Sequence, residues 1–267
     1  MLKRILSALI ALPLFFVILF LAPSWVLTIA ICLLSALACY EMLHATGLCK
    51  SITVLICALV CAAGLNPLLL YFDFSPALGV LICGILVFLC AVLSGGETDF
   101  REIFAAFLSC VFLPLALGSI LRIRLMEHGI FLVLLPFLAA WLTDTFAYFT
   151  GVLIGKHHIA PRISPKKTLE GCIGGTVLCT AASLALIPIA RSVWNIEPEI
   201  PNLLIIVFVS SVISQFGDLS MSYIKRGVGI KDYGKLMPGH GGVLDRFDSV
   251  LFSAPVAEIL LYFLKLV

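Results

Sequence analysis

Three aspartates in the C-terminal part of the chain have the chemistry to hold a divalent metal. Asp245 and Asp248 are three residues apart, so they would share one face of a helix that begins near Leu244. Together with Asp218 they form a set of hard oxygen ligands suited to Mg²⁺. The alternative is that Asp245 and Asp248 only stabilise the positive N-terminal end of a helix. The metal interpretation is favoured because basic residues and a Pro-Gly-His-Gly-Gly turn, whose small residues let backbone amides approach an anion, accompany them.

A second polar stretch, Ser164 to Thr168, could bind phosphate groups. It contains Lys166 and Lys167 in succession between two hydroxyl residues, and Gly171 follows. Cationic side chains and the backbone amides at the start of a helix are suitable ligands for a polyphosphate. An ordinary solvated cytoplasmic loop would explain the lysines alone, but not the whole cluster.

Three acidic residues fall inside apolar stretches. Asp218 lies seven residues before Lys225, which at about 1.5 Å per helical residue places it about 10 Å below the membrane surface. Asp144 lies deeper, and Glu258 is midway along the last apolar stretch. An ionised group at such a depth costs about 2.5 to 3.5 kcal/mol on insertion scales, so each is a candidate functional residue. The alternatives are an internal hydrogen bond or a pair with a lysine.

The elements that must position these residues are membrane-spanning helices. Of the 267 residues, 62% are hydrophobic and 12% are charged, which excludes a soluble globular protein and a disordered one. Hydropathy predicts nine spans, at about 5–22, 26–43, 52–71, 77–94, 104–121, 130–155, 172–190, 203–224 and 250–267. We therefore expect an all-α, polytopic integral membrane protein with about nine transmembrane helices. A single membrane domain would cover 1–267, with few motifs in 1–129 and the catalytic helices and cytoplasmic loops in 130–267.

The distribution of basic residues predicts the orientation. A cytoplasmic N-terminus places thirteen of the seventeen Lys and Arg residues on the cytoplasmic side, together with both polar loops, 156–171 and 225–249. Arg122 and Arg124 would lie on the other side and extend from the end of a span to the membrane surface. The net charge of +2 gives no general attraction to nucleic acid. The ten cysteines lack metal-ligand spacing and are interpreted as small buried hydrophobic residues.

The polar stretches carry a recognisable motif. It comprises a serine, a Lys-Arg pair, a Lys-Asp pair, a Pro-Gly-His-Gly-Gly turn and an Asp-Arg-x-Asp sequence, present here as Ser222, Lys225-Arg226, Lys231-Asp232, Pro238 to Gly242, and Asp245 to Asp248. This pattern resembles that of the bacterial phosphatidate cytidylyltransferases, also called CDP-diacylglycerol synthases. Two further stretches, Asp144 to Tyr148 and Ser164 to Gly171, match the same family, so the likeness is close in the C-terminal half. Met221 departs from it, because many members carry a glutamate there.

The resemblance implies an enzyme that condenses CTP with phosphatidate in the bilayer, giving CDP-diacylglycerol and pyrophosphate. It implies a Mg²⁺ cofactor and a multi-pass protein of the inner (plasma) membrane, with the N-terminus and active-site loops cytoplasmic. The catalytic residues would be Asp218, Asp245, Asp248, Lys225 and Arg246, of which the three aspartates would hold the metal. The substrate-binding residues would be Asp144, Ser164, Lys166, Lys167, Thr168, Ser222, Arg226, Lys231 and His240.

Two other functions stay open on the sequence. A CTP-dependent polyprenol or phytol kinase would need the same metal, lysines and lipid-facing site, but it would release CDP. An ion-coupled transporter would use Asp144, Asp218 and Glu258 as intramembrane carriers, although the sequence has no internal repeat. No nucleic acid partner is expected. A monomer and a homodimer are both compatible with the sequence.

Overall fold

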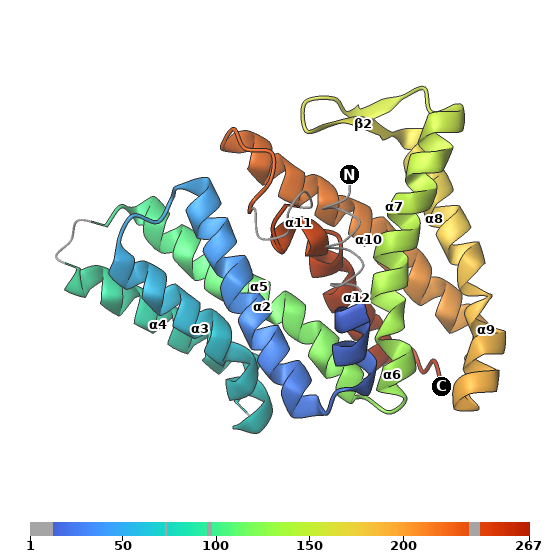
Figure 1. Cartoon of the computed structure of the whole chain (residues 1–267), viewed down its shortest axis with the longest axis horizontal. Helices are drawn as coiled ribbons and strands as arrows, with labels where there is room; N and C mark the ends of the chain where they lie inside the picture. Colours follow the sequence, from blue (N-terminus) through green and yellow to red (C-terminus); the bar gives the residue numbers. More distant parts are fainter. Residues whose placement is uncertain (1–12, 73, 95–97, 235–240) are drawn as a thin grey trace. The chain divides into compact units, whose positions relative to one another are not determined.

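The computed structural model describes residues 13–72, 74–94, 98–234 and 241–267. These residues form a series of helices interrupted by one antiparallel pair of short strands (Figure 1). In chain order, with η denoting a π-helix, the elements are η1 (Val17–Leu21), α2 (Ser24–Thr46), α3 (Ile52–Tyr71), α4 (Pro76–Leu93), α5 (Phe100–Leu125), α6 (Gly129–Leu132), α7 (Leu134–Ile154), β1 (His158–Ala160), β2 (Ser164–Thr168), α8 (Leu169–Ser183), α9 (Leu186–Ile189), η2 (Ala190–Trp194), α10 (Ile200–Gly227), α11 (Leu244–Phe247) and α12 (Val250–Phe263).

Over the described part of the chain, seven helical stretches are long and apolar enough to cross a membrane, judged by length and composition. They are Ser24–Thr46, Ile52–Tyr71, Pro76–Leu93, Phe100–Leu125, Gly129–Ile154, Leu169–Trp194 and Ile200–Gly227, and the shorter apolar helix Val250–Phe263 follows them. The prediction of a helical, polytopic membrane protein is confirmed. The first predicted span, 5–22, begins in residues outside the described ranges, and its described part contains η1.

The last helix is shorter than the sequence predicts. We expected a span over 250–267, whereas α12 ends at Phe263 and Leu264 is extended. The backbone N–H of Glu199 donates to the carbonyl oxygen of Leu266 at 2.8 Å. This hydrogen bond holds the last residues beside the start of α10, in place of a further helical turn.

The chain forms two units, each made of two separate stretches of sequence. Unit 1 comprises Met1–Leu121 and Val228–Phe247, and unit 2 comprises Arg122–Gly227 and Asp248–Val267. The polar stretch that follows α10 therefore belongs to unit 1, together with the N-terminal helices. The β1–β2 hairpin and α10 belong to unit 2.

Unit 1 contains α2, α3, α4, most of α5, and α11. Serine caps begin two of these helices, because the hydroxyl oxygen of Ser51 accepts from the N–H of Val54 and that of Ser75 accepts from the N–H of Leu78. Successive helices lie next to each other in the order α2, α3, α4. Short connections between apolar helices thus produce a layer of neighbouring spans.

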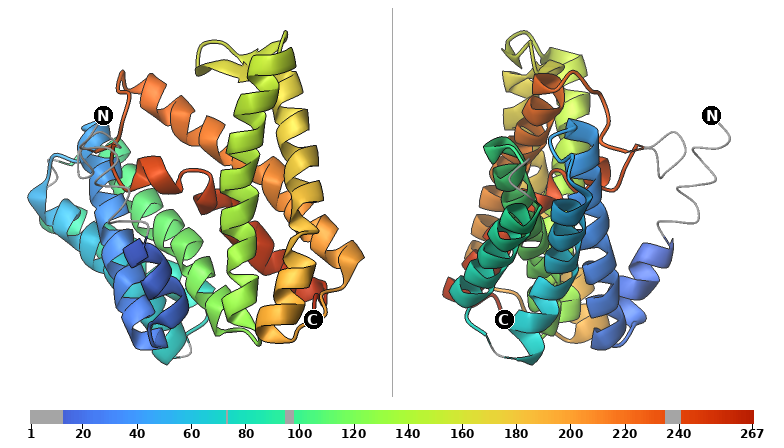
Figure 2. Two further views of the ribbon diagram at one scale, coloured as in Figure 1. Left: turned by 45° about the vertical axis from the view of Figure 1, so that its right-hand side comes forward. Right: turned by 90° about the vertical axis from the view of Figure 1, so that its left-hand side faces the viewer.

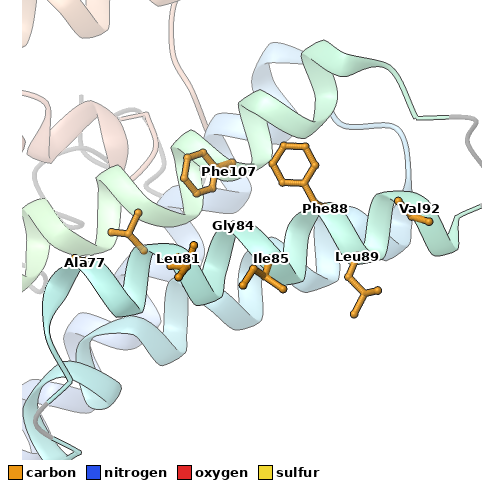
Figure 3. Close-up of a pocket in the computed structure, with 9 residues that line it drawn as sticks. Ala77, Leu81, Gly84, Ile85, Phe88, Leu89, Val92 and Phe107 are labelled. Atoms are coloured by element: carbon orange, nitrogen blue, oxygen red, sulfur yellow. The ribbon is translucent and has the colours of Figure 1, made fainter.

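A groove of about 670 Å³ runs along α4 beside α5 (Figure 3). Its lining is entirely apolar and includes Leu81, Ile85, Phe88 and Phe107. A site for phosphate groups needs polar ligands, so this groove is not where the predicted chemistry takes place.

Unit 2 contains α7, α8, α10 and α12, with α7 and α8 side by side (Figure 2). Their close approach depends on glycine, because a methyl group on Gly175 would lie 2.8 Å from the carbonyl oxygen of Thr143. Buried polar groups join α10 to this pair. The hydroxyls of Thr143 and Ser211 are 2.6 Å apart, and the Gln215 amide donates to the hydroxyl of Thr176 at 2.8 Å.

Candidate active site

The β1–β2 hairpin places the Ser164 to Thr168 stretch at one end of α7 and α8 (Figure 1). Thr168 caps α8, because its hydroxyl oxygen accepts from the backbone N–H of Gly171 at 3.2 Å. Glu170, in the first turn of α8, accepts from the N–H of Lys156 at 3.0 Å. Hydrogen bonds therefore connect α8 to Lys156, just before β1, and to the last residue of β2.

Lys167 and Asp218 form an ion pair between β2 and α10. The ammonium nitrogen Nζ lies 2.7 Å from Oδ2 of Asp218 and 3.2 Å from the backbone oxygen of Gln215. The two side chains are 12% and 28% exposed, so both charges are largely removed from solvent. A lysine from the polar hairpin therefore compensates a carboxylate that the sequence places within an apolar helix.

Ser249 links two further carboxylates. Its backbone N–H donates to Oδ1 of Asp248 at 2.9 Å, and its hydroxyl donates to Oδ2 of Asp144 at 3.1 Å. Lys225 is buried on α10, with its Nζ 4.0 Å from Oδ2 of Asp248. Burial raises the pKa of Asp248 to about 7, repulsion from Asp218 adds to the rise, and attraction to Lys225 opposes it. These acidic groups are therefore close enough to influence one another's ionisation.

Five charged residues of unit 2 thus form what we call the charge cluster: Asp144, Lys167, Asp218, Lys225 and Asp248. They come from α7, β2, α10 and the turn that precedes α12, so the hairpin stretch and the C-terminal motif both contribute. Three carboxylates against two ammonium groups leave one excess negative charge when all five are ionised. The cluster therefore favours the binding of a cation.

The end of α10 presents a polar face. Asp218, Ser222 and Lys225 are separated by four and three residues, so they follow one side of the helix. Ser222 is half-buried there. The guanidinium Nε of Arg226 donates to the backbone oxygen of Ile163 at 3.4 Å, which joins this end of α10 to the hairpin.

Asp245, the remaining predicted metal ligand, lies in unit 1. It is buried on α11, and its Oδ2 accepts from the N–H groups of Tyr233 and Gly242 at 2.8 and 2.9 Å. We call residues 228–234 and 241–247 the motif loop. The Asp245 carboxylate holds the backbone of this loop at Tyr233 and Gly242, as well as being a predicted ligand.

The other predicted residues differ in their exposure. Ser164 is half-buried and Lys166 is exposed on the hairpin, while Lys231 and Arg246 are exposed in unit 1. His240 lies outside the described residues. Exposed lysine and arginine side chains of this kind are accessible to an anionic substrate.

Asp245 and Asp248 do not share a helix. We expected one helix to carry both, but α11 ends at Phe247 and α12 begins at Val250. The Asp248 carboxylate accepts the N–H of Ser249, and such a local hydrogen bond competes with helical hydrogen bonding. The prediction of a shared helical face is wrong.

The oxygen donors of the charge cluster fit Mg²⁺ in their chemistry. Within the ranges that the structure describes, no three carboxylate, thiol or imidazole groups converge closely enough to hold a metal by themselves. In nucleotide sites, however, one or two carboxylates are enough, because phosphate oxygens and water complete the octahedral shell. Asp218 and Asp248 can supply such a pair. The ten cysteines are all free thiols; five are buried, as we expected, and the other five are half-buried.

Arg122 and Glu258 form an ion pair with two hydrogen bonds. Nε of Arg122 donates to Oε1 at 2.5 Å, and Nη2 donates to Oε2 at 2.9 Å. Arg122, which we expected to extend to the membrane surface, has a partner for its planar guanidinium in the half-buried carboxylate of Glu258 on α12. The charge of Glu258 is thereby compensated within unit 2 by an arginine, a partner that the sequence did not indicate.

Sequence reasoning missed Ser249 and Gln215, which organise the charge cluster. Ser249 donates to the carboxylates of Asp248 and Asp144. The backbone carbonyl oxygen of Gln215 accepts from the Lys167 ammonium. Ser249 directly follows Asp248, and Gln215 lies three residues before Asp218. This proximity to a predicted metal ligand is the signal that could have indicated them. Met221, at the position where the family often has a glutamate, is buried with 1% exposed, so an apolar side chain fills that place.

Comparison with known proteins identifies the family of this chain. The model of a family described as the cytidylyltransferase family matches residues 2–264. The phosphatidate cytidylyltransferase of Staphylococcus epidermidis (strain RP62A) is 35% identical over 267 residues, covering 97% of this chain and 98% of that protein. The protein of the same name from Staphylococcus aureus (strain COL) is 36% identical with the same coverage. That of Staphylococcus saprophyticus is 40% identical over 171 residues, which is 64% of this chain and 63% of the relative. The chain therefore belongs to the cytidylyltransferase family.

Proposed function

We propose that this protein is a phosphatidate cytidylyltransferase, which transfers a cytidylyl group from CTP to phosphatidate. The observation that supports this most directly is the charge cluster, in which Lys167 and Lys225 pair with Asp218 and Asp248 at the polar end of membrane helices. A lipid phosphate and a nucleotide triphosphate are both anionic, and both need cations at the membrane surface.

The proposed reaction needs alignment and charge neutralisation more than a general base. A phosphate monoester is already ionised near neutral pH, so an oxygen of phosphatidate can attack the α-phosphorus of CTP. A new P–O bond forms, the bond between the α-phosphorus and its bridging oxygen to the β-phosphorus breaks, and pyrophosphate leaves with the electron pair. Lys225 and Arg226 on α10, and Lys166 and Lys167 on the hairpin, are assigned to the phosphates of the two substrates.

Mg²⁺ is the proposed cofactor. Asp218 and Asp248 of the charge cluster are its proposed ligands, and Asp245 of unit 1 stays a predicted third. When bound, the ion supplies positive charge for the negative charge that develops on the leaving pyrophosphate. Lys231, Arg246 and the other motif residues of unit 1 are assigned to substrate phosphates on the resemblance to the family.

One assay distinguishes this function from its alternatives. Purified protein in detergent is incubated with phosphatidate, Mg²⁺ and CTP labelled at the α-phosphorus. A cytidylyltransferase moves the label into the lipid and releases pyrophosphate, whereas a CTP-dependent kinase leaves the label in CDP. The matched control is Asp248→Asn, which removes a proposed ligand at almost constant size. Label found only in CDP, with any lipid acceptor, would contradict the proposal.

The transporter alternative has less support because two of its three proposed carriers have ion-pair partners. Asp218 is paired with Lys167 and Glu258 with Arg122. Counterflow in proteoliposomes without nucleotide would support a transporter; we expect none.

We also propose that the hairpin and the motif loop face the cytoplasm, in the inner membrane of a bacterium. Single cysteines introduced at Lys166 and at Lys231, in a background without the ten native thiols, should react with an impermeant reagent from the same side of the membrane. Labelling from opposite sides would contradict this orientation. Light scattering of the detergent-purified protein distinguishes the monomer from the homodimer.

A further inference from the structure

Glu41 is a buried carboxylate in a part of the chain without any motif. It lies on α2, it is 4% exposed, and both of its oxygens accept backbone hydrogen bonds from the motif loop. Oε1 accepts from the N–H of Val243 at 3.0 Å, and Oε2 accepts from the N–H of Leu244 at 2.9 Å. An ionised carboxylate satisfies this arrangement fully, because both of its oxygens are acceptors. The two contacts join positions 202 and 203 residues apart.

Two glycines make room for this carboxylate. A methyl group on Gly242 would collide with both oxygens of Glu41, and one on Gly234 would collide with Oε1. In the sequence, glycines of the motif were expected to let backbone amides approach an anion. Within unit 1 the anion that they approach is the protein's own carboxylate.

Asp245 holds the same loop from its other side. Its Oδ2 accepts from the N–H groups of Tyr233 and Gly242. Gly242 therefore lies between the carboxylates of Asp245 and Glu41. Gly241 itself has a φ of +80°, and a methyl group there would lie 2.8 Å from the same Oδ2. The position of Asp245 is therefore coupled to the anchoring of the adjacent residues by Glu41.

We propose that Glu41 is a positioning residue for the reaction: by binding the amides of Val243 and Leu244 it holds the loop that carries Asp245 and Arg246. The inference rests on the proposed assignment of Asp245 and Arg246 to catalysis. It predicts that Glu41 affects turnover without touching either substrate, because small displacements of catalytic groups are costly for rate.

The chain offers a matched control in Glu102. This glutamate is also 4% exposed and lies in unit 1, and its Oε1 accepts from the N–H groups of Lys50 and Ser51 at 3.0 and 2.6 Å. It therefore does for the turn before α3 what Glu41 does for the motif loop. No proposed site residue lies in that turn. In Glu41→Gln the N–H₂ group must face one of two backbone N–H groups, because each oxygen of Glu41 accepts one bond. The matched change at the control position is Glu102→Met, which removes the single oxygen that accepts both bonds.

The test compares the two variants in detergent by amide hydrogen exchange and by kinetics. We expect Glu41→Gln to speed exchange at Val243 and Leu244, and to lower kcat on the order of 10²-fold with little change in the KM for either substrate. Glu102→Met should lower the unfolding temperature, speed exchange at Lys50 and Ser51, and leave kcat within about twofold of the wild type.

Either of two results would overturn the inference. One is unchanged exchange at Val243 and Leu244 in Glu41→Gln, whatever the activity. The other is an equal kcat in the two variants, which would make Glu41 a stabilising residue only. If Glu41→Gln does not fold, Gly242→Ala decides the question, because it displaces the loop from an intact carboxylate; a normal kcat there would overturn the inference. If the wild type forms no CDP-diacylglycerol, the proposed function fails, and the exchange result reports separately on the anchoring.

Discussion

Lys167 and Asp218 are 51 positions apart in the sequence and 2.7 Å apart in the structure. This pair explains how α10 can carry a carboxylate inside an apolar stretch, since the counter-charge comes from a hairpin outside the span. The hairpin is fixed to α10 by the same lysine that a substrate phosphate would attract.

The first prediction concerns this pair. Lys167→Ala should lower the free energy of unfolding by about 1 to 3 kcal/mol, because it leaves a largely buried carboxylate without its main partner. The control is Lys166→Ala, which removes an exposed lysine and should change stability by about 0.5 kcal/mol or less. Thermal unfolding of both variants in one detergent measures the difference. Equal unfolding temperatures would mean that the pair contributes nothing to stability.

The second prediction concerns the metal. Asp218→Asn should raise the Mg²⁺ concentration needed for half-maximal activity by about tenfold or more, because it removes a proposed ligand at constant shape. The requirement for phosphatidate should change much less. Titration of Mg²⁺ at saturating substrates measures the effect. A normal half-saturating concentration and a normal maximal rate would make Asp218 a structural partner of Lys167 and nothing more.

The third prediction concerns pH. Burial raises the pKa of Asp248 from 3.8 to about 7, so between these values the metal-free folded protein holds a proton that the unfolded chain releases. The contribution of this carboxyl to the free energy of unfolding therefore falls as the pH rises from about 4 to about 7, by at most about 4 kcal/mol in total. Above pH 7 that contribution no longer changes. In the presence of a chelator, the unfolding temperature of the wild type relative to Asp248→Asn should fall from about pH 4 to about pH 7. A difference that does not change with pH would contradict the prediction.

The fourth prediction concerns Arg122 and Glu258. Glu258→Gln should lower the free energy of unfolding by about 1 to 3 kcal/mol, because a partly buried guanidinium loses its partner. Replacing both residues by apolar ones, as in Arg122→Met with Glu258→Leu, should recover much of that loss. Cytidylyl transfer should stay within about twofold of the wild type in both cases, because neither residue is assigned to a substrate or to the metal. A large loss of kcat at full stability would show a functional role.

The membrane architecture was accessible from sequence because burial in lipid is a local property. A run of about twenty apolar residues identifies a span whatever it packs against, and the helices that the structure describes begin and end within a few residues of the predicted limits. All five residues of the charge cluster were predicted site residues, but their contacts were not predicted. Asp144 and Asp218 were selected because an ionised group inside an apolar helix is costly. Lys167 was selected as a phosphate ligand near the start of a helix, and Lys225 and Asp248 were selected from the C-terminal motif.

The remainder depended on contacts between distant positions. The Arg122–Glu258 pair joins residues 136 positions apart, and no spacing rule relates them. Glu41 had no neighbouring motif, so nothing in its own segment indicated a partner more than two hundred residues away. The break between α11 and α12 was hidden for a different reason. It depends on a hydrogen bond within two residues, Asp248 and Ser249, whose propensities are compatible with a continuous helix.

The discontinuity of unit 1 has a consequence for the time course of synthesis. Glu41 enters the membrane early, but the amides that satisfy its carboxylate are made 202 and 203 residues later. At bacterial elongation rates on the order of 5 to 20 residues per second, this delay is about 10 to 40 s. Throughout that interval Glu41 on α2 lacks the backbone amides that its carboxylate binds in the finished protein. It is during this period that a chaperone, an insertase or a protease would distinguish the unfinished protein from the finished one.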